Sequence, residues 1–251
     1  MKKLLLVFCL FSIIFPIYSQ VKLDQKRLDG YIQTSTRVSN KFNYDTGMFE
    51  KTETQSRYYS LPDGEYEVVQ DLNVKYTIVV NGVVSIYTNK KHKIITKDFD
   101  SSFDNTMFLV PMGLASLTLG GGNNVLSISS KTPLKSILSV SGYLTMLNNV
   151  EISNSVVDHG VVYISAGKTF IDGAVIVDNK SQVSCSGIYI VGGTLDLSSG
   201  ILYDNYVNSE NRGACIYNGG DVRNTIVRVY GLALSPGKSY NDNIMYVNIR
   251  I

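Results

Sequence analysis

The sequence of 251 residues predicts an all-β protein whose main part is a parallel β-helix with about 25 residues in each coil. Between residues 137 and 220, four segments repeat one order of short apolar runs separated by glycine. In addition, glycine and asparagine recur there with the same period, so two independent residue types mark one repeat. The predicted turn glycines are Gly142, Gly167, Gly192 and Gly219, and the predicted closing asparagines are Asn154, Asn179 and Asn205.

Each repeat contains three short runs rich in Val, Ile, Leu and Tyr, with glycine between them, which favours strands over helices. In a parallel β-helix each strand pairs with its equivalent in the next coil, at about 4.8 Å. A β-sandwich needs no fixed period, and its hairpin strands are usually longer. Inward side chains are expected to stack in three columns: Leu138, Val162, Ile188 and Ile216; Leu144, Phe170, Leu195 and Val222; and Ile152, Ile176 and Leu202.

The recurring asparagines have a physical rationale, because Asn tolerates a left-handed backbone and can bond its counterpart in the next coil. The alternative is that Asn is simply a common turn residue. Because three asparagines share one spacing, a stacked row is favoured over this alternative. Asp178 and Asp204 each precede one of them and are predicted to stack at one corner, as solvated turn residues or as a cation-binding pair.

Two repeats resemble a known family: GVVYISAGKTF…VIVDN and GIYIVGGTLDL…ILYDN are similar to the Gly/Asn-rich repeats of bacterial surface or secreted right-handed parallel β-helix proteins. That family includes adhesin-type and polymorphic outer-membrane-type passengers. The upstream segment MFLVPMGLASLTLGGGNNVLSIS is similar to first rungs of such proteins. The resemblance covers roughly residues 78–237, implies a right-handed coil, and is silent on activity. Cys215 departs from it, replacing a usual second glycine, and so does the irregular segment DVRNTIVRVYG.

Residues 1–19 have the pattern of a secretory signal peptide. Lys2 and Lys3 precede the apolar run LLLVFCLFSIIF, and Pro16 and Ser19 follow it, so cleavage is expected before Gln20. The run is too short to span a bilayer comfortably, and Cys9 lies inside it rather than at a lipidation site. We therefore expect a mature chain without an integral membrane segment, secreted or associated with the cell surface or outer membrane.

Residues 20–75 are predicted to be a polar leader and N-terminal cap. Within them, residues 20–60 are either a flexible leader or a pair of strands around Asp45-Thr46-Gly47. Because repeat arrays must cover their exposed strand edges, a cap is expected near here. Residues 76–251 are predicted to form the β-helix, with a closing strand in KSYNDNIMYVNIRI and a surface excursion at residues 89–106 around a strand at Ile94-Ile95.

The charge and the aromatic content of the chain limit which classes of partner are expected. The net charge is +2, and no basic patch with interleaved aromatics occurs, so nucleic acid is not an expected partner. The chain has 17 tyrosines and no tryptophan. Tyrosine suits carbohydrate or protein contact faces, but it also suits strands in general.

No constellation of residues predicts catalysis or a cofactor, and no catalytic, cofactor-binding or metal-binding residue is assigned. His92 and His159 lack metal-ligand spacing, and the glycines at residues 120–124 lack the lysine of a phosphate loop. The acidic residues of the repeats are scattered singly: Asp158, Asp172, Asp178, Asp196, Asp204 and Asp221, with Arg212, Arg223 and Arg228 one rung further on. Cys185 and Cys215 are either a disulfide between adjacent coils or two small thiols, and the alignment of Cys185 with Gly213 favours thiols.

The sequence thus predicts an exported bacterial surface or secreted protein with a non-catalytic adhesion or ligand-binding role, its partner a host or envelope glycan or protein. The alternatives are a polysaccharide-active enzyme, either a lyase or a glycoside hydrolase, and a structural component of the envelope. A contiguous row of exposed tyrosines or aspartates on one face would distinguish between binding modes.

Overall fold

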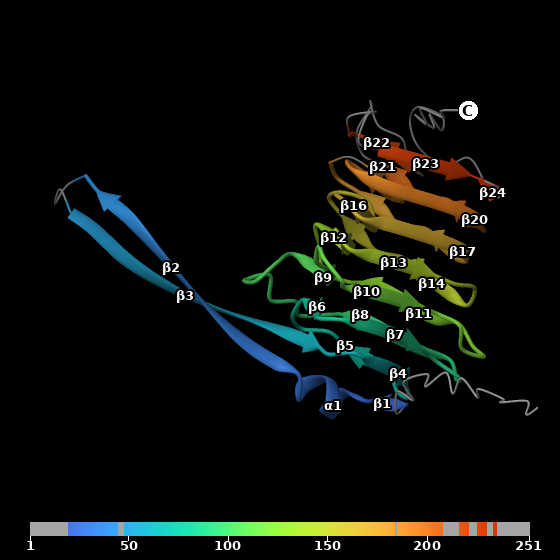
Figure 1. The fold of residues 1–251 in the computed structure, drawn as a ribbon, viewed down its shortest axis with the longest axis horizontal. Helices are drawn as coiled ribbons and strands as arrows, with labels where there is room; N and C mark the ends of the chain where they lie inside the picture. Colours follow the sequence, from blue (N-terminus) through green and yellow to red (C-terminus); the bar gives the residue numbers. More distant parts are fainter. Residues whose placement is uncertain are drawn as a thin grey trace, which may run out of the picture.

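The computed structural model describes residues 20–44, 48–183, 185–207, 216–220, 225–229 and 233–234 (Figure 1). The protein is all-β with large parallel sheets, and the described residues contain one short helix, α1 (Gln25–Asp29). The strands lie one above another in a stack, from which a long hairpin projects. The sequence-based prediction of an all-β chain with parallel strands is confirmed.

Within the described residues, the largest sheet has thirteen strands arranged as two rows. The first row contains β1 (Val21–Leu23), β4 (Gly64–Val68), β7 (Val83–Tyr87), β10 (Ser116–Leu119), β13 (Tyr143–Met146), the first halves of β17 (Lys168–Val177) and β20 (Gly193–Tyr203), and β23 (Thr225–Val229). The second row contains β5 (Leu72–Asn73), β8 (His92–Thr96), β11 (Leu126–Ser130), β14 (Val150–Ser153), the second halves of β17 and β20, and β24 (Ala233–Leu234).

Two further sheets complete the described architecture. The eight-stranded sheet contains β2 (Ile32–Asn43), β3 (Met48–Leu61), β6 (Ile78–Val80), β9 (Thr106–Val110), β12 (Ser136–Val140), β16 (Val162–Ile164), β19 (Ile188–Ile190) and β22 (Ile216–Asn218). The three-stranded sheet contains β15 (Val156–Val157), β18 (Lys180–Ser181) and β21 (Tyr206–Val207). The chain visits the eight-stranded sheet, the first row and the second row in turn, and then returns to the eight-stranded sheet; we call one such pass a repeat.

Two of the three predicted columns of inward residues are confirmed. In the eight-stranded sheet Leu138 pairs with Val162, which pairs with Ile188, which pairs with Ile216, and all four are buried. In the second row the buried column is Ile152, Ile176 and Leu202. Stacked branched apolar side chains at equivalent positions therefore form a continuous core between the sheets.

The third predicted column is wrong by one residue. Leu144 pairs with Thr169, not with Phe170, and Thr169 pairs with Leu195. Thr169 is fully buried, whereas Phe170 is half-exposed, because successive residues of a strand face opposite sides and a slip of one residue exchanges them. Val222 lies outside the described residues, and Val227 pairs with Leu195 instead.

The predicted series of turn glycines is also displaced by one residue. Lys168 pairs with Thr194, so Gly193, not Gly192, lies above Gly167. Both have a left-handed backbone, with φ of +71° at Gly167 and +85° at Gly193. A Cβ on Gly167 would lie 1.9 Å from the carbonyl oxygen of Gly142, so the turns stack too closely for any side chain here.

A buried asparagine ladder joins adjacent repeats. The Asn179 Nδ2 donates to the Asn205 Oδ1 at 3.1 Å and to the Ile152 carbonyl at 3.0 Å, while its Oδ1 accepts from the backbone N–H of Ser155 at 3.1 Å. Asn179 and Asn205 are both fully buried. The predicted third member, Asn154, is exposed, and Ser155 occupies the equivalent position. Met146 pairs with Ile171 but Glu151 pairs with Val175, so the turn before Asn154 has one residue more than its equivalent in the next repeat, which the average spacing does not reveal.

At the N-terminal end of the stack, α1 covers the first repeat. The Asp24 side chain accepts from the Arg27 backbone N–H at 2.8 Å, which caps the helix. Leu28 is fully buried in the core, and Gln25 exchanges two hydrogen bonds with the backbone of Asn73 in β5.

Residues 20–60 contain a pair of strands rather than a flexible leader. All twelve residues of β2 pair antiparallel with β3, and the end of β3 continues parallel to β6 through Tyr59, Ser60 and Leu61. The rest of the hairpin extends away from the stack (Figure 1). The predicted turn at Asp45-Thr46-Gly47 lies outside the described residues. So do the expected signal peptide at 1–19, Cys9, Cys215 and the predicted closing strand.

Candidate binding surface

A row of tyrosines lies on the outer face of the eight-stranded sheet. Tyr163, Tyr189 and Tyr217 are the central residues of β16, β19 and β22 and pair with one another in register. Both strand neighbours of Tyr163 and of Tyr189 are buried, and so is Ile216 before Tyr217. The alternation of a strand therefore directs the three rings outward, where each is half-exposed. The ring centroids are 5.6 Å apart for Tyr163 and Tyr189 and 5.2 Å apart for Tyr189 and Tyr217.

Two basic side chains extend this row. The His159 ring stacks on Tyr189 with centroids 5.6 Å apart and planes at 25°, and it lies 6.0 Å from Tyr163. The Lys135 Nζ lies 4.9 Å from the centroid of the Tyr163 ring, within cation–π range. We call these five side chains the tyrosine strip: Lys135, His159, Tyr163, Tyr189 and Tyr217.

Sequence reasoning missed the strip although its signal is visible. The segments VYI, IYI and IYN place tyrosine at the centre of three successive equivalent strands. The abundance of tyrosine by itself is compatible with a contact face and with a general strand preference, and it does not single out these three residues. In the two preceding repeats the equivalent positions hold Ser139, which pairs with Tyr163, and Leu109, which pairs with Ser139. Tyrosine therefore occupies this column only from Tyr163 onward.

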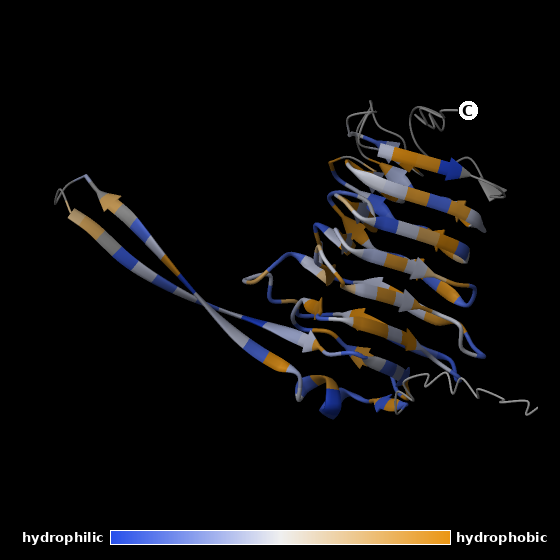
Figure 2. Ribbon diagram, in the orientation of Figure 1, coloured by the Kyte–Doolittle hydropathy of each residue, from blue (hydrophilic) through white to orange (hydrophobic). Residues whose placement is uncertain are grey.

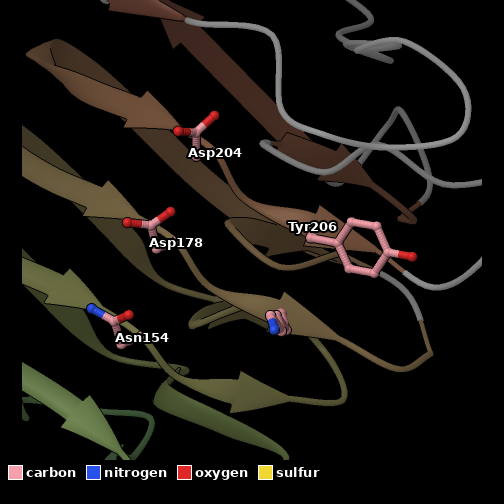
Figure 3. A pocket seen from close by; sticks show the side chains of 5 residues that line it. Asn154, Asp178, Asp204 and Tyr206 are labelled. Carbon is pink, nitrogen blue, oxygen red and sulfur yellow. The ribbon is translucent and has the colours of Figure 1, made fainter.

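The aspartate corner was predicted from the sequence, and its residues do stack. Asn154, Asp178 and Asp204 stack in successive repeats, with φ of +52°, +53° and +50° (Figure 3). They border an open depression together with Lys180 and Tyr206, which pair between β18 and β21. In the part of the chain that is described, no three His, Cys, Asp or Glu side chains are grouped so as to hold a metal ion. The side chains of Asp178, Asp204 and Lys180 thus border the same depression.

Two other aspartates of the repeats make structural bonds. The carboxylate of Asp196 accepts hydrogen bonds from the Arg228 Nε at 2.6 Å and from its Nη2 at 3.1 Å. The Lys168 Nζ lies 3.5 Å from the same carboxylate. The hydrogen bonds from Arg228 hold the pKa of Asp196 below its usual value, against the effect of burial. Asp172 accepts a 2.6 Å hydrogen bond from the Ser199 hydroxyl. Arg212, Arg223 and Asp221 lie outside the described residues.

The two histidines are far apart in the fold. His92 lies on β8 in the second row, with Nδ1 3.7 Å from the Asp71 carboxylate, whereas His159 belongs to the strip. Cys185 is fully buried beside Ile188, its Sγ 3.2 Å from the Ile188 carbonyl oxygen.

No protein-family model, no curated protein and no solved structure matches this chain significantly. Across the described ranges, no helix has both the length and the apolar character needed to cross a membrane.

Proposed function

We propose that the chain is a right-handed parallel β-helix of an exported bacterial protein, and that its tyrosine strip binds a glycan without catalysis. Parallel pairing between successive repeats supports the coil. Right-handedness follows from the strong preference for right-handed crossovers between parallel strands of one sheet. Residues 20–75, with α1 and the hairpin, then form its N-terminal cap, and export to the medium or the cell surface rests on residues 1–19.

The tyrosine strip is the observation that carries the binding function. Aromatic rings pack against the C–H faces of sugar rings, and a phenol hydroxyl is a group that can hydrogen-bond sugar hydroxyls. Because the strip repeats one residue type at the strand spacing of about 4.8 Å, it matches a ligand that is itself a chain of repeated units. An oligosaccharide or polysaccharide of the host or of the envelope fits this description.

The geometry around the strip favours binding over cleavage. Glycoside hydrolysis needs two carboxyl groups on either side of one sugar bond. The five side chains of the strip include no carboxylate, and Asp196 lies on another sheet, engaged with Arg228. A polysaccharide-active enzyme and a structural envelope component are the competing functions.

The test is a glycan array probed with the full chain, followed by affinity measurements on the best ligand. Tyr189→Ala removes the ring that contacts Tyr163, Tyr217 and His159, so the affinity should fall about tenfold or more. Tyr143→Ala is the matched control, because Tyr143 is 51% exposed but lies on β13 in the first row.

Three results would contradict the proposal. Equal affinities of Tyr189→Ala and the unaltered chain would place the ligand elsewhere. Release of reducing ends or unsaturated products would mean an enzyme. Failure to bind any glycan on the array would favour a structural role.

A further inference from the structure

We propose that the tyrosine strip selects glycans that carry an acidic group, a carboxylate or a sulfate, and that Lys135 binds this group. This selectivity rests on the glycan binding proposed above and adds the charge of the ligand to it. The observation behind it is the place of Lys135 within the strip, where its Nζ lies 4.9 Å from the centroid of the Tyr163 ring.

The strands beneath the strip and beside it contain no charged residue. The sequences of β12, β16, β19 and β22 are SILSV, VYI, IYI and IYN, and Figure 2 shows apolar segments throughout the stacked strands. The basic groups of the strip therefore come from the turns that precede β12 and β16, where Lys135 and His159 lie.

The two basic residues occupy equivalent positions in successive repeats. The Lys135 backbone N–H donates to the Asn105 carbonyl at 2.7 Å, and the His159 N–H donates to the Lys135 carbonyl at 2.9 Å. The Lys135 side chain lies over the ring of Tyr163 in the following repeat. In the same way, His159 stacks on the ring of Tyr189, one repeat after its own. A basic row therefore runs beside the tyrosines with the same strand spacing of about 4.8 Å.

The ammonium group of Lys135 has no acidic partner among the described residues. Its side chain is half-exposed, and Asp158 precedes His159 on the neighbouring turn, but Lys135 forms no ion pair with Asp158 or with another described carboxylate. By comparison, the Lys168 Nζ lies 3.5 Å from the Asp196 carboxylate. A partly buried ammonium without a counterion has lost part of its hydration, and an acidic group of a ligand can restore hydrogen bonds to it.

The contact between Lys135 and Tyr163 also decides the sign of the ligand's charge. The face of an aromatic ring attracts cations, so a row of tyrosines alone is compatible with a positively charged ligand. Here the ammonium of Lys135 already lies over the Tyr163 ring, and it repels a second cation. An acidic group beside Lys135 gains a charge-assisted hydrogen bond, while the sugar ring that bears it packs on the tyrosines.

The glycan array gives the first test with the full chain. The glycans that bind should be acidic, and chemical removal of the charge from the best ligand should lower its affinity about tenfold or more. Reduction of the carboxyl groups to alcohols tests for a carboxylate, and desulfation tests for a sulfate. A best ligand without an acidic group would overturn the proposal.

Lys135→Met tests the residue itself, because methionine keeps an unbranched apolar side chain and removes the charge. It should lower the affinity for the acidic ligand about tenfold and leave the affinity for the uncharged derivative unchanged, whereas Tyr189→Ala should weaken both. Lys135→Arg keeps the charge and should keep the preference for the acidic form. Lys93→Met is the matched control, because it removes one exposed positive charge from β8 in the second row. Its affinities should equal those of the unaltered chain.

The outcomes separate this selectivity from glycan binding as such. Equal affinities for the acidic ligand and its uncharged derivative would overturn the selectivity and leave binding at the strip intact. An equal loss for Lys135→Met and Lys93→Met would also overturn it, because the net charge of the chain would then determine the affinity. If no glycan binds, or if Tyr189→Ala binds as tightly as the unaltered chain, the proposed function itself is wrong.

Discussion

At the scale of single residues, Ile188 tests the column of inward side chains. It is fully buried between Val162 and Ile216, so Ile188→Ala leaves a cavity that neighbouring repeats cannot fill and should cost about 2–5 kcal/mol of the free energy of unfolding. Ile188→Asp should cost more, because it buries an unpaired carboxylate. Thr194→Ala, at a half-exposed position, should cost less than about 0.5 kcal/mol. Denaturant unfolding measures all three, and similar small effects of Ile188→Ala and Thr194→Ala would refute the inward assignment.

Asn179 tests the ladder at the same scale. Asn179→Ala removes the partner of the buried Ser155 N–H and two donated hydrogen bonds, so we expect a loss of about 1–3 kcal/mol. The exposed neighbour Lys180 is the control, and Lys180→Ala should change the free energy of unfolding by less than about 0.5 kcal/mol. Equal values for the two variants would mean that the ladder contributes nothing to stability.

At the scale of elements, the stacked turns between the eight-stranded sheet and the first row depend on glycine. Gly113→Ala should cost about 1–3 kcal/mol, because its φ is +108° but no atom lies near the added Cβ. Gly167→Ala has the same kind of strain, and its Cβ also collides with the Gly142 carbonyl oxygen that bonds the Lys168 N–H. Thermal unfolding should show the larger loss for Gly167→Ala, and the reverse order would contradict this close stacking of turns.

The contact between β20 and β23 should make stability depend on pH. The pKa of Asp196 is lowered in the folded state by Arg228, so its contribution is complete above the usual carboxyl pKa of 3.8. As the pH falls below 3.8, the unfolded chain binds the proton first, and the contribution is lost as the pH passes the folded pKa. Asp196→Asn should therefore lower the unfolding temperature more near pH 7 than below about pH 3. An equal difference at both pH values would exclude the ion pair as its cause.

At the scale of the whole molecule, one sheet carries both the hairpin β2–β3 and the tyrosine strip. The eight-stranded sheet begins with the hairpin β2–β3 and ends with β22, so the hairpin and the tyrosine strip are at opposite ends of the strand order. The strands β6, β9 and β12 lie between them in that order.

The export of the whole chain has its own test. Cleavage is expected before Gln20 because a short apolar run with two preceding lysines is a substrate for secretion. The first strand, β1, begins at Val21 and pairs with β4, so cleavage there leaves the described fold intact. Mass spectrometry of the protein from its native cells should find the N-terminus near Gln20 outside the cytoplasm. An uncleaved chain in the cytosol would contradict the prediction.

The sequence by itself determined the strand content, the period and two of the three inward columns. Apolar periodicity and glycine spacing are local properties, and they survive in any arrangement that buries the apolar face. The sequence did not determine the exact strand register, because turns of unequal length shift the pairing by one residue without disturbing the average period. That shift exchanged Thr169 for Phe170 in the core and Ser155 for Asn154 in the ladder.

Only the tertiary structure decided the surfaces. The tyrosine strip joins side chains from successive repeats, and His159 and Lys135 enter it from turns, so its continuity depends on register and on turn geometry together. The hairpin was one of two possibilities for a polar segment, because most of β2 and the first half of β3 are exposed and lack the alternation that burial imposes. Their pairing with each other, and the continuation of β3 along β6, are long-range contacts that no local pattern encodes.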